Sequence, residues 1–171
     1  IINELSYSQD CYFLKLNIEM QAQKRTKITI STVINARIDR VWGLWTKPHH
    51  IIHWNHASDD WLTSYAENDL REGGRFLSHM EARDGSAGFD FSGGYNKIIP
   101  KQSIIITLDD SRSVTVDFVE KGGKTIITET FEAEEINSVE LQRFGWQSIL
   151  DNFKNYAETP GENETLRFEV K

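Results

Sequence analysis

The chain has 171 residues, of which 39% are hydrophobic and 26% are charged, a composition typical of one soluble globular domain. Its formal net charge of −7 excludes a surface built to bind nucleic-acid phosphates, and its single cysteine, Cys11, excludes an internal disulfide. The sequence has neither a secretory signal pattern nor an apolar run of the roughly 18 residues that a membrane span needs, so we expect a cytoplasmic protein without membrane contact.

The first part of the chain alternates apolar and polar residues twice, and then changes to a helical period. Residues 12–20 (YFLKLNIEM) and 27–35 (KITISTVIN) both have period two, which predicts two strands. In residues 38–46 (IDRVWGLWT) the apolar side chains recur at helical spacing, and Pro48 ends that helix or begins the next turn. We expect a second short helix over residues 48–56.

Six short alternating segments follow, and turn residues separate them. They cover residues 61–65, 74–82, 89–98, 103–108, 113–119 and 125–133. Separators such as Asp84-Gly85 and Gly122-Gly123 contain the glycines that tight hairpins need for their positive φ angles. Consecutive strands without helices between them predict an antiparallel meander.

The last long segment, residues 138–158, has the pattern of an amphipathic helix. Its apolar side chains fall on one stripe, and Ser138 is in position to cap its N-terminus. Residues 166–170 alternate again. A sheet of about six to seven strands with a single long helix to cover it predicts an α+β fold, in which a curved antiparallel sheet wraps around the C-terminal helix and two short helices follow the first strand. An aromatic-rich inner face in such a sheet predicts an apolar cavity.

Several motifs occur in an order that resembles the START-like helix-grip (SRPBCC) superfamily. They are VWGLWT (41–46), Trp54, DLREGGRF (69–76), Gly94-Tyr95 and Gly145-Trp146. Within that superfamily the set is similar to the family named after the activator of the heat-shock-protein-90 ATPase. The resemblance implies a helix-grip domain over residues 26–158. The extensions 1–25 and 159–171 lie outside the resemblance, and their alternation predicts that they are strand-like.

The resemblance leaves three functions open. The first is a carrier of small hydrophobic or aromatic ligands, the second is a co-chaperone-like module that stimulates a chaperone ATPase, and the third is a cyclase- or hydrolase-like enzyme. No catalytic residue is common to the family pattern, so we identify none and favour a protein that is not an enzyme. The alternating flanks, 12–20 and 165–170, present unpaired strand edges, which favours a homodimer.

Residues 48–56 contain four of the five histidines: His49, His50, His53 and His56. On one helix, three of them would share a face that zinc could use. The HExxH pattern is absent, however, and the apolar residues Ile51, Ile52 and Trp54 interleave with the histidines. We interpret the segment as a helix that covers one end of the cavity, and we expect neither a metal nor a cofactor.

Glu129 lies on a strand face that the alternation predicts to point inward, together with Thr125, Ile127 and Phe131. A buried carboxylate is unfavourable unless it is paired, and desolvation raises its pKa. An inward Glu129 would orient a polar ligand or act as an acid or base, whereas a strand end or bulge would return it to solvent. Both outcomes are open.

We expect the cavity to bind its ligand through seven side chains: Trp54, Phe76, Met80, Tyr95, Glu129, Trp146 and Phe153. Ser78 shares a face with Phe76 and Met80, so the adjacent His79 should point outward. This opposition, and the absence of a GxSxG motif, argue against a serine hydrolase.

Overall fold

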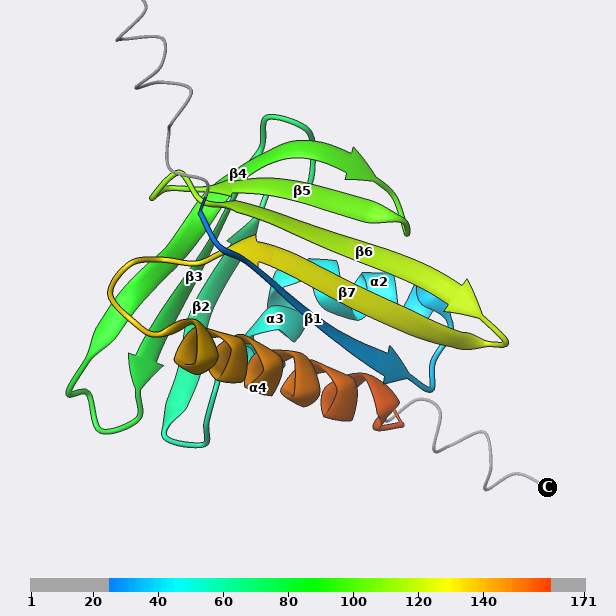
Figure 1. Cartoon of the computed structure of the whole chain (residues 1–171). Coiled ribbons are helices and arrows are strands. Elements are labelled where there is room, and N and C mark those ends of the chain that lie inside the picture. The colour runs from blue at the N-terminus through cyan, green and yellow to red at the C-terminus, as the bar shows by residue number, and fades with distance from the viewer. Residues whose placement is uncertain (1–24, 161–171) are drawn as a thin grey trace, which may run out of the picture.

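A computed structural model describes residues 25–160 of the chain (Figure 1). The elements follow in the order β1 (Lys27–Ile34), α2 (Ile38–Thr46), α3 (Pro48–Trp54), β2 (Trp61–Asn68), β3 (Arg75–Ala82), β4 (Gly88–Ile99), β5 (Ser103–Leu108), β6 (Ser113–Lys121), β7 (Lys124–Glu132) and α4 (Val139–Glu158). The strands predicted at 12–20 and 166–170, and the dimer inferred from them, lie outside the described residues.

The seven strands form one antiparallel sheet in the order β1-β7-β6-β5-β4-β3-β2. β1 and β2 are consecutive in the chain but occupy opposite edges, so the α2–α3 connection has to cross from one edge to the other. In Figure 1 the sheet is strongly curved, and α4 lies across its open side. The predicted α+β helix-grip fold is therefore confirmed.

Three local features bend and join the strands. The pairing register shifts between Thr63 and Tyr65 in β2 and between Tyr95 and Lys97 in β4, and such bulges increase the bend of a strand. A side chain at position 93 would place its Cβ only 2.6 Å from the carbonyl oxygen of Thr107, so Gly93 permits close approach of the neighbouring strand. Gly122-Gly123, with φ angles of 61° and 75°, forms the tight β6–β7 turn.

Helix α4 begins as the sequence predicts, because the Ser138 hydroxyl accepts a hydrogen bond from the Leu141 backbone N–H at 3.1 Å. Its polar face also covers the edge strand β1. Arg143 donates to the carbonyl of Thr29 at 2.8 Å, and Gln147 reaches that of Ser31 at 3.5 Å. These bonds satisfy backbone groups that an open sheet edge would expose. Within residues 25–160 no helix is long and apolar enough to cross a membrane.

We predict that Leu150→Ala will lower the free energy of unfolding by about 2–5 kcal/mol, because the Leu150 side chain is fully buried under the sheet. Leu141→Ala is the matched control on the same helix: its side chain is 56% exposed, and we expect a change within about 0.5 kcal/mol. Urea unfolding followed by circular dichroism measures both. Equal losses would contradict the packing of α4 described here.

Candidate functional site

A pocket of about 620 Å³ lies between the inner face of the sheet and the helices. Its lining comes from α2, α3, the strands β2 to β7 and the N-terminal half of α4. The volume is in the range that holds a drug-sized molecule. Six of the seven side chains that the sequence nominated line this pocket: Trp54, Phe76, Met80, Tyr95, Glu129 and Trp146.

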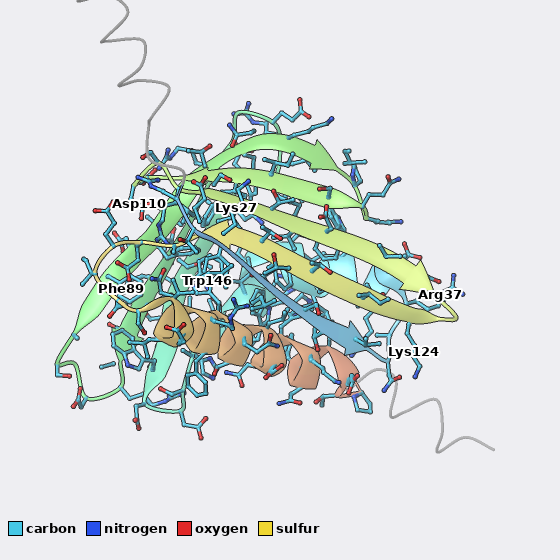
Figure 2. All side chains as sticks on the ribbon, viewed as in Figure 1. Lys27, Arg37, Phe89, Asp110, Lys124 and Trp146 are labelled. Atoms are coloured by element: carbon cyan, nitrogen blue, oxygen red, sulfur yellow. The ribbon has the colours of Figure 1, made fainter. Side chains whose placement is uncertain are left out.

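Stacked rings form one wall. Trp146 lies parallel to Phe131 with ring centroids 3.9 Å apart, and its edge meets Phe91 at 5.8 Å. Phe76 continues the wall, 5.6 Å from Phe91 and 5.7 Å from Tyr95. Figure 2 shows Trp146 between α4 and the sheet. Contacts of this kind fix the rings in place, so the wall is preformed.

At the opposite end, α2 and α3 hold a second group of rings. Trp54 stacks on Trp45 at 4.9 Å, and its indole N–H donates to the carbonyl of Leu44 at 3.2 Å. Phe153, which we expected to contact the ligand, does not line the pocket. It is fully buried edge-on against Trp45 at 4.7 Å and against Trp54 at 4.8 Å, so it supports this wall from behind.

Glu129 points into the pocket, and only 6% of the residue is exposed. β7 pairs without interruption at this position, with Ile30 of β1 on one side and Val116 of β6 on the other. The strand end or bulge that would have returned the carboxyl to solvent is therefore absent. Within residues 25–160 no hydrogen bond or ion pair reaches this carboxyl group. Burial raises the pKa of Glu129 to about 8, so the group is largely protonated at neutral pH.

Some of the other polar side chains of the pocket are hydrogen-bonded within the protein, and others are not. The Tyr95 hydroxyl donates to the Asn68 side-chain oxygen at 2.7 Å, and the Asn68 amide donates to the carbonyl of Thr46 at 2.6 Å. Burial raises the pKa of Tyr95, which therefore stays neutral. Ser78, 4% exposed, makes no side-chain hydrogen bond to any described residue. Asn55, 9% exposed, also lines the pocket and makes no side-chain hydrogen bond to any described residue. Glu129, Ser78 and Asn55 are thus the buried polar groups that a ligand could engage.

Ser78 and His79 lie on opposite faces of β3, as the alternation predicts. Ser78 lines the pocket, whereas His79 is on the outer surface with its Nδ1 2.6 Å from a carboxylate oxygen of Asp90. That hydrogen bond raises the pKa of His79. The two side chains cannot act together on one substrate.

The pocket reaches the surface at two places. One is the loop after α3, where the lining residues Ala57 and Ser58 are exposed, next to the segment 48–56 that we expected to cover one end of the cavity. The other is marked by Ile136, which is 94% exposed, and by Phe89, which is 50% exposed. In Figure 2 Phe89 lies at the same end of the molecule as Asp110, another lining residue.

None of the four clustered histidines lines the pocket. Helix α3 ends at Trp54, so His56 is not on the helix and the three-histidine face does not form. His50 is hydrogen-bonded to the Tyr156 hydroxyl at 2.7 Å, and His53 stacks on the same ring. Over residues 25–160 no three His, Cys, Asp or Glu side chains are grouped to hold a metal ion. His50 and His53 instead connect α3 to Tyr156 in the C-terminal half of α4.

Sequence reasoning did not nominate most of the lining residues, among them Trp45, Phe91 and Ile149. Signals for two of these three were present. Phe91 shares a strand face with Phe89 in the segment 89–98, and Ile149 lies on the predicted apolar stripe of 138–158. For Trp45 the helical period indicated burial, but it could not distinguish a pocket wall from the core.

The family model for Activator of Hsp90 ATPase homolog 1-like protein matches residues 35–158. An AHSA1-like protein from Aeromonas hydrophila is 45% identical, over 78% of this chain and 92% of that chain, with a TM-score of 0.74. Chr148 from Cytophaga hutchinsonii is 41% identical, over 85% and 96%, with a TM-score of 0.69. CV1439 from Chromobacterium violaceum, at 20% identity over 79% and 99%, shares the fold with a TM-score of 0.72. No curated protein matches the chain.

We predict that Glu129→Gln will stabilise the protein increasingly as the pH rises. The folded-state pKa of about 8 lies above the ordinary value of 4.5, so the unfolded chain releases this proton first. The parent therefore loses about 1.4 kcal/mol per pH unit between these two values. The variant has no such loss. We therefore expect the two proteins to have equal free energies of unfolding near pH 4, and the free energy of unfolding of the variant to be higher by a few kcal/mol at pH 8.

Urea unfolding at pH 4, 6 and 8 measures this difference. The control is Glu135→Gln, which removes the same negative charge at an exposed position. A difference that stays constant with pH would mean that Glu129 is ionised in the folded protein.

Proposed function

The chain belongs to the Activator of Hsp90 ATPase homolog 1-like protein family, and from this premise we propose that it binds a small apolar or aromatic molecule in the pocket between the sheet and α4. The observation that supports this proposal is the pocket itself, with its volume of about 620 Å³ and its walls of stacked rings. Burial of ligand surface against these walls would supply on the order of 25 cal/mol per Å² of apolar area.

The free polar groups would set the orientation of the ligand. Glu129 and Ser78 are buried and lack partners among the described residues, so a polar ligand atom placed at either would gain a hydrogen bond. Tyr95 is already held by Asn68 and serves as part of the wall. A cyclase- or hydrolase-like reaction would require Glu129 and Ser78 to act on the same ligand, and chemical change of a bound ligand would reveal it.

A second candidate function is a protein-interaction module, as the family's name suggests. Three apolar side chains near the start of α4 support it: Ile136, Leu141 and Phe144 are 94%, 56% and 71% exposed. Exposed apolar groups close together are typical of a partner-binding surface. In an assay of Hsp90 ATPase stimulation, a module of this kind would lose its effect with Phe144→Ser.

We predict that the neutral dye N-phenyl-1-naphthylamine will bind the protein with enhanced fluorescence, and that Ser78→Phe will weaken this binding by at least about tenfold, or about 1.4 kcal/mol. The new ring would occupy pocket volume, because Ser78 faces inward. Leu77→Phe adds a ring at the neighbouring position on the outer face, and we expect it to leave the affinity unchanged.

Fluorescence titration gives the dissociation constants, and circular dichroism checks that each variant is folded; Met80→Trp fills the same pocket if Ser78→Phe is unstable. Absence of dye binding to the parent protein, or equal weakening by both ring insertions, would contradict the proposed pocket function.

A further inference from the structure

We infer that the pocket selects a ligand with a cationic nitrogen, a protonated amine joined to an apolar body, and that Glu129 is the counter-ion of this amine. The inference rests on the proposed function, since it specifies the ligand class of the same pocket. Three independent features of the described residues support it: an unpartnered buried carboxyl, an acidic set of lining charges, and aromatic walls.

The first feature is the isolation of Glu129. Its cross-strand neighbours are Ile30 and Val116, and its neighbours along the same face are Ile127 and Phe131. None of these side chains can donate a hydrogen bond. The ionised form of a carboxyl group in such surroundings is unfavourable until a cation or several donors reach it. No described residue supplies them, so the donor has to arrive with the ligand, and an ammonium group brings donors and charge together.

The second feature is the charge of the lining. Besides Glu129, the ionisable lining residues are Glu67 on β2, Tyr95 on β4, Asp110 and Arg112 around the start of β6, and Glu134 before α4. The lining residues of α2, α3, α4, β3 and β5 have no ionisable side chain, and no residue of β1 lines the pocket.

Arg112 is the single cationic side chain in this lining, and it is already engaged. Its Nε donates to Asp110 at 2.7 Å, and another of its nitrogens donates to the carbonyl of Glu132 at 3.3 Å. The remaining lining charges are acidic, in a chain whose net charge is −7. A cationic ligand is therefore attracted and an anionic ligand is repelled.

The third feature is the aromatic wall beside Glu129. Phe131 follows two residues later on the same strand face, and Trp146 stacks on Phe131 at 3.9 Å. Trp146 itself lines the pocket, as do Phe76 and Phe91. Aromatic rings, indole above all, attract a desolvated cation through their quadrupole. The wall therefore favours an ammonium group at the position where the carboxylate would neutralise it.

Three ten-carbon compounds with different head groups test this inference: decylamine, decanol and decanoate. Each is titrated against the dye-loaded full chain at pH 6 and at pH 9, where an alkylammonium remains protonated as a lysine side chain does. Glu129 has to lose its proton before it can pair with the amine, so the affinity for decylamine should rise about tenfold per pH unit up to the pKa of about 8.

At pH 9 we expect decylamine to bind at least about tenfold more tightly than decanol, and decanoate to bind most weakly. At pH 6 the advantage of decylamine over decanol should largely disappear. Glu129→Gln should abolish both the preference and its pH dependence, whereas Glu140→Gln, a control at an exposed position of α4 that does not line the pocket, should preserve both. Glu129→Met serves as the second pocket variant if Glu129→Gln does not fold.

The outcomes separate the inference from the proposed function. If decanol equals decylamine at pH 9 while both displace the dye, the pocket binds apolar molecules and the cationic selectivity is wrong. If Glu129→Gln keeps the preference for decylamine, the assignment of Glu129 as counter-ion is wrong. If neither the dye nor any decyl compound binds, the proposed function itself fails.

Discussion

The unequal packing of α4 along its length determines where this protein is filled and where it is hollow. In the C-terminal half of the helix, Leu150, Phe153 and Ala157 are buried against the core. In the N-terminal half, Trp146 and Ile149 border the pocket instead. The sheet is a single curved layer, and within residues 25–160 its inner side is covered by this helix together with α2 and α3. The side chains of α4 therefore fill the interior toward its C-terminus and border the pocket toward its N-terminus.

Glu129 is the residue whose placement packing alone does not explain. Its strand face is otherwise filled by Thr125, Ile127 and Phe131, all of which are buried. An apolar side chain there would avoid the desolvation that raises the pKa of Glu129 to about 8. Departures of this kind from the local pattern are typical of functional sites, where stability is lost for the sake of binding or chemistry. The proposed ligand would account for that loss, since the pocket would bring it to the carboxyl group.

Much of the fold could be predicted because local periods record which face of each element is buried. Alternation identified the strands, and Ser138 identified the start of α4. Whether an inward side chain lies in the core or borders the pocket was not predictable. Phe153 and Trp146 lie on one helical stripe, yet Phe153 is enclosed by Trp45 and Trp54, whereas Trp146 borders the pocket. The end of α3 at Trp54 was also not predictable, because the apolar and histidine spacing continues past it. Both depend on contacts between segments that are distant in sequence.

The two candidate functions meet in the loop of residues 134–137. Ile136 lines the pocket and is also 94% exposed beside the start of α4. Gln142 holds this loop, since its side chain accepts from the Glu134 backbone N–H at 2.9 Å and donates to the carbonyl of Asn137 at 2.8 Å. Gln142 lines the pocket as well. A ligand that contacts Gln142 would therefore also stabilise one arrangement of the exposed apolar loop, so ligand binding and partner binding would be coupled through it.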